Sequence, residues 1–560
     1  MSGVKYVVID ILEALREHET LSAAQLDRIV RAHSKRAHDG RRYYAKKRIL
    51  PYYLRVKAEA GPLWESWHVD SKLDERFVKT LQMKPRRTAS GVATITVITK
   101  PWPCANSCIY CPNDPHMPKS YLSDEPACQR AERNHFHPYL QVASRLHTLE
   151  QMGHSTDKIE LIVLGGTWLD YPESYRLWFI YELFSALNDD EGSRAEALAN
   201  GAINDKPSPT SLTLDDLYQE HQKNEEAAHR VVGLVVETRP DTITPSALKH
   251  LRQLGCTKLQ LGVQSINDEL LCINGRRETA SRIAESFMLC RLFGFKLHAH
   301  FMVNLLGATP ESDRADYRTF AHAPEFQPDE VKLYPCALVE GTELVNRYHE
   351  GLWKPYTEDE LIAVLSQNLL DTPAFMRVSR MIRDISAKDI LVGNKKTNLR
   401  QLVEEHLAGC ADQVREIRYR EVGTSSFDFE SLKLEEMVYG TLGTQEHFLQ
   451  WVDSQGRIAA FLRLSLPQPD VLRSFGDSIP LSEHDAMIRE VHVYGFATGI
   501  DRKGASAQHR GLGRKLVERA CEIARDSGYQ HMNVISAIGT RAYYRKLGFT
   551  DNGLYQRRAL

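Results

Sequence analysis

Short apolar runs alternate with longer amphipathic stretches between residues 86 and 340 of this 560-residue chain. Apolar runs bounded by turn residues are typical of buried strands, and longer stretches with a repeat near 3.6 residues are typical of helices. The pattern predicts strands at 92–99, 159–164, 231–236, 258–262, 296–303 and 330–333. It predicts helices between them at 129–152, 173–187, 245–254, 280–293 and 311–322. This α/β order indicates a parallel sheet curled into a partial (β/α)6 barrel, whose functional site lies at the carboxyl ends of the strands.

The pattern changes on both sides of the barrel region, so we expect four parts. Residues 1–85 predict a small helical module, in which Ser22 and Gln25 form a capping-box-like helix start. Residues 341–415 predict a helical connector. Residues 416–560 predict an α+β domain with antiparallel strands, a turn at 453–456, a strand at 489–495, a long helix from Gly511 and a final strand at 532–536. Within the barrel region, the polar segment 190–228 predicts a surface insertion.

The composition is that of a globular protein with enough length to bury several cores. The chain is 42% hydrophobic and 26% charged, and no stretch resembles a signal peptide or a membrane span. We therefore expect a cytoplasmic protein that has no membrane partner. In that compartment its ten cysteines are expected to be reduced rather than paired in disulfides.

Three cysteines follow the first predicted strand with the spacing Cys104-x-x-x-Cys108-x-x-Cys111. Thiolates select soft metals, and three close together can ligate three irons of a [4Fe–4S] cluster while the fourth iron stays open. An open iron can chelate S-adenosylmethionine, which an electron from the cluster then cleaves to a 5′-deoxyadenosyl radical. Tyr110 between the last two cysteines is typical of radical-SAM enzymes. The alternatives are a partial zinc site or three structural thiols, but no CxxC or CxxH partner follows at zinc-ribbon spacing.

Glycines and polar residues end the next three predicted strands. Gly165-Gly166-Thr167 ends the second strand, where backbone groups can approach a ligand such as the amino group of S-adenosylmethionine. The third strand ends at 237–241 and the fourth at 262–265, and both put polar groups at the barrel mouth. The alternative role is helix capping, for which Asp241 and Ser265 are well suited.

A second motif, Gln508-His509-Arg510-Gly511-Leu512-Gly513, opens a predicted helix after a strand. Glycines permit a tight chain reversal, and exposed amides at a helix N-terminus bind a diphosphate, as in the acetyl-CoA loop of GNAT acyltransferases. Tyr543 and Tyr544 follow the next strand, where a tyrosine can donate a proton to the departing CoA thiolate. The alternative for Tyr543 is packing beneath the acyl tunnel.

Segment 31–55 is strongly basic, although the net charge of the whole chain is only −2. Basic groups bind phosphates and tyrosines stack on unpaired bases, a combination suited to RNA. The alternative is a solvated basic helix face. The candidate RNA-binding residues are Lys35, Arg36, Arg41, Arg42, Lys46, Lys47 and Arg48, with Tyr43, Tyr44, Tyr52 and Tyr53 interleaved.

A radical-SAM barrel joined to a C-terminal GNAT domain resembles the catalytic subunit of Elongator and its single-chain archaeal and bacterial counterparts, which modify tRNA. The segments that carry the resemblance are 84–91, 153–158, 165–167, 237–241, 383–385, 398–400, 420–423, 490–495 and 539–548. The family implies 5-carboxymethylation of the wobble uridine in the anticodon stem-loop of tRNA, with acetyl-CoA and S-adenosylmethionine. It implies that acetyl-CoA contacts Lys158, Glu490, Val491, His492, Val493, Gln508, Gly511, Leu512, Gly513 and Tyr543.

The resemblance leaves several points open. Many relatives carry a zinc site between the barrel and the GNAT domain. Three of its candidate ligands remain here, namely Cys336, His406 and Cys410. Glu416 and Tyr419 stand where further thiolates are expected, which argues against a bound zinc ion. The electron donor is unknown, and the family is compatible with self-association or with Elongator-like accessory subunits.

Two other functions compete with tRNA modification. One is a protein lysine acetyltransferase in which the barrel is only a scaffold, and the other is a non-enzymatic RNA-binding assembly subunit. The intact cysteine loop argues against a barrel that serves only as a scaffold. The basic, aromatic N-terminal segment suits RNA better than a peptide.

Overall fold

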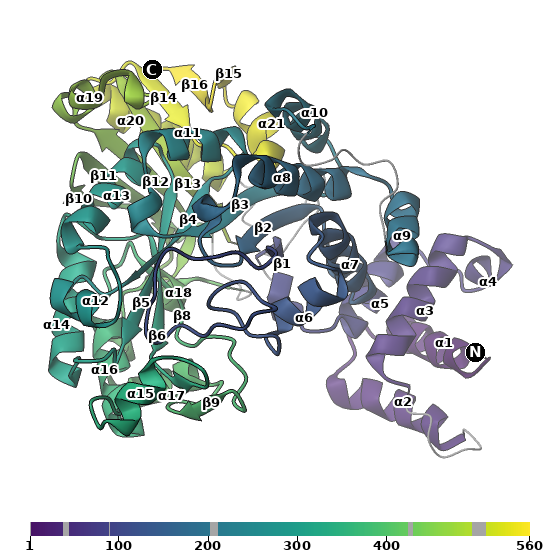
Figure 1. Cartoon of the computed structure of the whole chain (residues 1–560). Coiled ribbons are helices and arrows are strands. Elements are labelled where there is room, and N and C mark those ends of the chain that lie inside the picture. Colours follow the sequence, from purple (N-terminus) through teal and green to yellow (C-terminus); the bar gives the residue numbers. More distant parts are fainter. Residues whose placement is uncertain (1, 37–43, 89, 202–210, 424–428, 495–510) are drawn as a thin grey trace.

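The structure is a computed structural model that describes residues 2–36, 44–88, 90–201, 211–423, 429–494 and 511–560. It consists of a helical module at the N-terminus, a curled α/β barrel and a C-terminal domain against one end of that barrel (Figure 1). None of the described helices is long and apolar enough to cross a membrane.

The N-terminal module packs around its own apolar core. Its described helices are α1 (Ser2–Glu17), α2 (Ala23–Arg36), α3 (Lys46–Glu59), α4 (Pro62–Glu65) and α5 (Ser71–Leu81). Helix α2 begins as predicted, because the backbone amide of Ser22 donates to Gln25 Oε1 (2.9 Å) and that of Gln25 donates to Ser22 Oγ (3.3 Å). Tyr53 and Phe77 are fully buried at the centre of the module, which lies beside the barrel (Figure 1).

The barrel is a curled sheet of seven parallel strands in the order β1-β2-β3-β4-β5-β6-β8. The predicted strands are all present, as β1 (Ala93–Ile98), β2 (Lys158–Leu164), β3 (Arg230–Thr238), β4 (Lys258–Gln264), β5 (Lys296–Val303) and β6 (Glu330–Pro335). The seventh, β8 (Arg377–Arg380), lies within the segment that was expected to be helical. Helices α8 (Glu173–Asn188), α11 (Pro245–Gln253), α13 (Ala280–Leu292) and α14 (Pro310–His322) cover its outer face (Figure 1). The partial barrel is therefore confirmed, with one more strand than predicted.

Two segments inside the barrel region differ from the pattern expected. The helix expected at 129–152 is two helices, α6 (Pro126–Arg133) and α7 (Pro138–Gln151), because Pro138 starts a new helix and His135 and Phe136 adopt positive φ. The expected surface insertion 190–228 contains α9 (Glu191–Asn200) and α10 (Leu214–Asn224), and α10 packs on α8. The amide of Asn224 is fully buried yet satisfied, since it donates to His229 O (3.0 Å) and Asn188 Oδ1 (2.8 Å).

The segment after β6 is mixed rather than helical. It holds β7 (Leu338–Val339), α15 (Leu344–His349), α16 (Glu358–Leu370), β8, β9 (Ile390–Val392) and α17 (Leu399–His406). Strand β8 extends the barrel sheet beside β6, and β7 pairs with β9 in a small separate sheet.

The C-terminal domain has a seven-stranded sheet in the order β10-β11-β12-β13-β14-β16-β15. Its strands are β10 (Lys433–Thr441), β11 (Thr444–Val452), β12 (Ile458–Pro467), β13 (Asp485–Val493), β14 (His531–Val534), β15 (Thr550–Asn552) and β16 (Tyr555–Ala559). Helices α20 (Leu512–Asp526) and α21 (Arg541–Arg545) flank β14 in sequence. The strand expected to be last is β14, and two further strands follow it. Residues Arg463 and Leu464 of β12 pair with Glu490 and Ile488, so Arg489 is the extra residue of a β-bulge.

Candidate active site

The cysteine loop lies at the carboxyl ends of the barrel strands and is held by backbone contacts from two neighbouring loops. Ile109 N donates to Asn274 O (3.1 Å), and Leu344 N donates to Ile109 O (2.8 Å). Gly275 has φ +74°, and a Cβ on it would lie 2.5 Å from Ser107 O, so only glycine permits this approach. The thiols of the predicted cluster ligands Cys104, Cys108 and Cys111 are free and half-buried.

Two buried guanidinium groups donate to the sulfur atoms of this loop. Arg239 Nη1 lies 3.2 Å from Cys104 Sγ and Arg276 Nη1 lies 3.7 Å from Cys108 Sγ. Burial opposes the charge of both arginines, but neighbouring carboxylates and cysteines raise their pKa above the ordinary value. Burial and the neighbouring Cys108 raise the pKa of the Cys111 thiol to about 11. Without a metal the loop therefore favours protonated Cys111, and positive charge on bound iron would favour its thiolate.

The donor set fits an iron–sulfur cluster better than a single metal ion. Three free thiols on one loop, with positive hydrogen-bond donors to two of the sulfurs, suit an anionic cluster in which each thiolate binds a different iron. Among the residues that the structure describes, no three His, Cys, Asp or Glu side chains could hold one metal ion. Cys104, Cys108 and Cys111 would hold the cluster.

The Gly165-Gly166-Thr167 turn lies against the cysteine loop. Gly165 has φ +134°, and a Cβ there would lie 1.9 Å from Thr99 Oγ1, so the turn needs glycine. Thr167 Oγ1 lies 4.0 Å from Cys104 Sγ and accepts a hydrogen bond from Arg239 Nη1 (2.6 Å). The structure therefore brings this turn and the cysteines together, while its contact with S-adenosylmethionine stays a prediction.

The sequence analysis did not single out Arg276, and it gave Arg239 no specific role. Arg239 was expected only as part of a polar strand end, and the structure shows it bridging Cys104, Asp170 and Asp241. Arg276 follows Gly275 in the loop after helix α12 (Asp268–Ile273), and a basic residue directly after a glycine was the available signal.

In the C-terminal domain, Tyr543, Gly513 and Val493 converge at the N-terminus of α20. A Cβ on Gly513 would lie 2.8 Å from Tyr543 Oη and 3.5 Å from Val493 Cγ2, so the glycine leaves room for the phenol. Gly511 caps the helix with φ +75°. This cradle of amides and a phenol suits a diphosphate followed by a thioester.

The remaining residues predicted at this site differ in their surroundings. Tyr543 is 41% exposed, whereas Tyr544 is 7% exposed and packs against Phe549 in the domain core. Burial raises the pKa of both tyrosines, so both are protonated at neutral pH. Leu512 is buried in the same core. Gln508 lies outside the described residues, and Lys158 begins β2 opposite Arg230.

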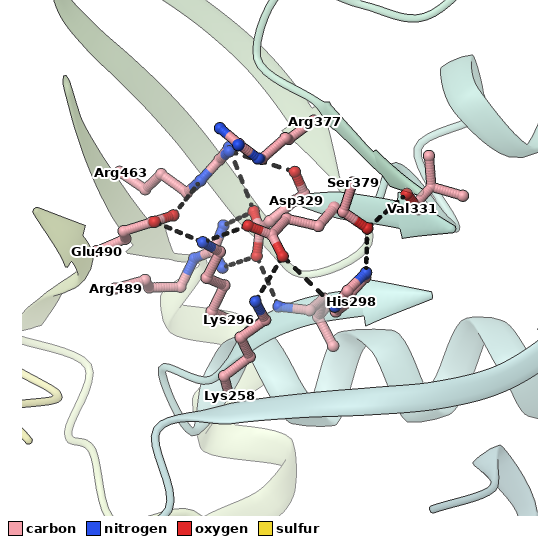
Figure 2. Close-up of polar contacts among 12 residues, drawn as sticks. Lys258, Lys296, His298, Asp329, Val331, Arg377, Ser379, Arg463, Arg489 and Glu490 are labelled. Atoms are coloured by element: carbon pink, nitrogen blue, oxygen red, sulfur yellow. Dashed lines mark hydrogen bonds and ion pairs between the residues drawn. The ribbon is translucent and has the colours of Figure 1, made fainter. Parts of the chain in front are cut away.

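Glu490 forms one ion pair with the barrel and one within its own domain (Figure 2). Its Oε1 lies 2.5 Å from Lys296 Nζ and its Oε2 lies 2.9 Å from Arg463 Nε. Lys296 also pairs with Glu330 (2.7 Å). Because Lys296 and Glu330 are the first residues of β5 and β6, the C-terminal domain docks at the amino ends of the barrel strands. The cysteine loop lies at the opposite ends.

His492 lies two residues after Glu490 on β13, and one of its ring nitrogens makes no hydrogen bond to a described residue. Its Nε2 is buried and has no hydrogen-bond partner among the described residues, and its ring stacks on Phe461 at 5.5 Å. Burial lowers the pKa of His492 to about 4, so the imidazole is neutral at pH 7 and can accept or donate a hydrogen bond. The adjacent Val491 is half-buried.

A cavity of about 600 Å³ lies inside the barrel and extends to the C-terminal domain. Its wall includes Leu164, which immediately precedes the Gly165 turn, and Glu490, His492 and Tyr544 of the C-terminal domain. Residues of both domains line this space, which we call the shared cavity; Cys104, Cys108, Cys111, Gly513 and Tyr543 are not among its lining residues.

Comparison with known proteins gives the family. Residues 104–319 match the radical SAM superfamily, residues 328–408 a radical SAM C-terminal domain and residues 412–549 the acetyltransferase (GNAT) family. A tRNA uridine(34) acetyltransferase of Methanocaldococcus infernus is 37% identical over 86% of this chain and 88% of its own length. The chain belongs to the tRNA uridine(34) acetyltransferase family.

Other members of the tRNA uridine(34) acetyltransferase family are similarly close to this chain in sequence or fold. Elongator complex protein 3 of Homo sapiens is 34% identical over 85% of each chain. The archaeal Elp3 structure from Methanocaldococcus infernus, with an N-terminus deletion (1-46), matches with a TM-score of 0.70 and 34% identity, and covers 84% of this chain and 100% of that chain. The predicted fold class is confirmed, and the protein is an acyltransferase of the radical SAM class.

The basic segment is only partly available to RNA. Lys47 and Arg48 are exposed at the start of α3, whereas the amine of Lys46 donates to Thr80 O (2.8 Å). Tyr44 and Tyr53 are buried in the core of the module and cannot stack on bases, which corrects that part of the interpretation. Lys35 and Arg36 end α2, and Arg41, Arg42 and Tyr43 lie outside the described residues. RNA binding by this segment stays a prediction.

The three residues that correspond to zinc ligands of family relatives lie in different parts of the structure. Cys336 is buried in an apolar cluster with Tyr110 and Met302, and Cys410 packs against the main core. His406 is the last residue of α17.

Proposed function

We propose that this enzyme makes 5-carboxymethyluridine at the wobble position of tRNA from acetyl-CoA and S-adenosylmethionine, in the cytoplasm. The observation that carries the proposal is the shared cavity, because its wall runs from Leu164, beside the cysteine end, to His492 and Tyr544. A radical must be shielded from water, so both substrates have to meet in one enclosed space. Family membership supports tRNA as the substrate.

In the proposed reaction the protein holds two reactants at opposite ends of the barrel. When bound, the cluster and S-adenosylmethionine supply the 5′-deoxyadenosyl radical, which takes hydrogen from the acetyl methyl group. The acetyl carbon adds to C5 of uridine, and the adduct loses one electron and the C5 proton. This release balances the electron consumed in cleaving S-adenosylmethionine. Water then hydrolyses the thioester to a carboxylate and free CoA.

The chain's own residues bind and orient these groups. The amides at Gly511 and Gly513 bind the diphosphate of acetyl-CoA, and Tyr543 donates its proton to the departing thiolate. Arg239 and Arg276 hold Cys104 and Cys108 in position. Lys47 and Arg48 contribute to binding of the tRNA backbone.

Anaerobic reconstitution with two variants tests the proposal. Cys108→Ala should abolish formation of 5-carboxymethyluridine, and Tyr543→Phe should lower tRNA-stimulated hydrolysis of acetyl-CoA. Acetylation of a lysine-rich peptide by the Cys108→Ala protein, without any tRNA product from wild type, would instead support a protein lysine acetyltransferase. Cluster loading without cleavage of S-adenosylmethionine would support the non-enzymatic RNA-binding role.

A further inference from the structure

Lys332 differs from the other lysines that line the shared cavity. Lys258 and Lys296 each pair with Glu330, at 2.5 and 2.7 Å. Lys332 lies two residues after Glu330 on β6, lines the same cavity and is only 8% exposed. Among the described residues it has no carboxylate partner, and its single hydrogen bond goes from Nζ to Gln260 Oε1 (2.6 Å). An ammonium group has three N–H donors, so two are available to a ligand.

Gln260 presents a further donor beside Lys332. Its Oε1 accepts from Lys332 Nζ and lies 3.1 Å from His300 Nε2, so its carbonyl is fully used. Its amide nitrogen makes no hydrogen bond to a described residue, and the side chain lines the cavity. Together the two residues offer hydrogen-bond donors and no free acceptor. Their surface is complementary to a carbonyl oxygen.

The energetics of the lysine favour a ligand of this kind. Burial lowers the pKa of Lys332 to about 8, so the amine is largely protonated at neutral pH. A buried ammonium with one neutral partner is unfavourable, and a further carbonyl acceptor would offset the lost hydration.

We propose that Lys332 and Gln260 bind the O4 carbonyl of the target uracil inside the cavity and thereby select uridine over cytidine. The inference rests on the proposed function, which requires a uridine to reach the space between the cysteine end and the acyl-CoA end. O4 is attached to the carbon next to C5, so this contact orients the reacting edge of the base. Cytosine carries an amino group at the same position, which donates hydrogen bonds and cannot accept from Lys332 or Gln260.

The test compares the affinity of the cluster-loaded enzyme for two transcripts of the same tRNA, one with uridine and one with cytidine at position 34. Wild type should bind the uridine transcript about tenfold more tightly, because one hydrogen bond to a charged group has roughly that effect on Kd. Lys332→Met should bring the ratio close to one, whereas Lys332→Arg, which keeps a charged donor, should retain part of it. Lys249→Met, at an exposed lysine on α11, is the matched control and should behave as wild type.

A second measurement needs no variant and covers the case in which Lys332→Met fails to fold. Reductive methylation followed by mass spectrometry should show protection of Lys332 by the uridine transcript and not by the cytidine transcript. Equal protection by both transcripts, or an unchanged affinity ratio in a folded Lys332→Met protein, would overturn the inference. An unchanged ratio with a raised Kd for acetyl-CoA would also overturn it and assign Lys332 to the thioester. A wild-type enzyme that forms product but binds the uridine and cytidine transcripts equally tightly contradicts only this inference. A wild-type enzyme that forms no product contradicts the proposed function.

Discussion

The guanidinium of Arg489 in the C-terminal domain binds the carboxylate of Asp329 in the barrel through two contacts of 2.6 and 2.8 Å (Figure 2). Both side chains are fully buried. Arg489 is the extra residue of the bulge in β13, the strand that runs on to His492 and Val493. Asp329 immediately precedes β6, the strand that carries Lys332. The barrel thus fixes the strand that the acyl-CoA site is built on.

Asp329→Asn should destabilise the protein strongly. The substitution leaves a buried Arg489 with only Glu446 as a charged partner, and breaking a buried ion pair from one side typically costs about 3–5 kcal/mol. Urea denaturation followed by tryptophan fluorescence measures the change. Asp470→Asn, at an exposed carboxylate that pairs with Arg473, is the control and should leave the midpoint unchanged. A wild-type midpoint for Asp329→Asn would contradict the account of the interface.

Acid should weaken the same interface. Burial by itself would raise the pKa of Asp329, Glu330 and Glu490, but the neighbouring arginines and lysines outweigh it and hold each pKa below its ordinary value. Such groups stabilise the folded state at any pH above the unfolded pKa of about 4, and that stability is lost as the pH falls towards the folded values. These groups should therefore change the melting temperature little between pH 7 and 5, and the melting temperature should fall steeply below about pH 4. A melting temperature independent of pH in that acid range would be inconsistent with these ion pairs.

Glu225 should affect acetyl-CoA turnover indirectly, through its ion pairs with two arginines of α21. Its carboxylate contacts Arg545 (2.5 Å) and Arg541 (3.4 Å), which stand on either side of Tyr543 in sequence. Arg545 is 40% exposed, so the contact is partly screened and Glu225→Gln should raise KM for acetyl-CoA by no more than about fivefold. Steady-state hydrolysis assays with the exposed neighbour Glu226→Gln as control measure this. Identical KM values for the two variants would show that Glu225 does not position Tyr543.

Arg276→Met should shift the reduction potential of the loaded cluster to a more negative value. The variant removes a positive hydrogen-bond donor 3.7 Å from Cys108 Sγ, and positive donors at the sulfurs favour the reduced state. A redox titration monitored by electron paramagnetic resonance gives the midpoint. Arg277→Met, at the exposed neighbour, should leave it unchanged. A common midpoint for both variants would remove Arg276 from the cluster environment.

The barrel strands were predictable because their apolar runs are local signals, whereas β8 was not. Arg377–Arg380 is a polar sequence that becomes a strand only by pairing with β6, and Arg377 pairs with Glu421 far along the chain. Helix α10 was missed for a similar reason, since Asn224 is polar but its amide is satisfied by the side chain of Asn188, far back along the chain, and by the nearby backbone of His229. The cofactor motifs are local and could be found in the sequence. Arg276, the partner of Cys108, and Lys296, a partner of Glu490, are far from them in the sequence, so only the fold brings them together.

The most direct test of the central claim is nucleoside mass spectrometry of tRNA from cells that lack this gene and from the same cells carrying wild type or Cys108→Ala. We expect 5-carboxymethyl-type uridines with wild type and their absence both without the gene and with Cys108→Ala. Equal amounts of these nucleosides in all three strains would contradict the proposed reaction.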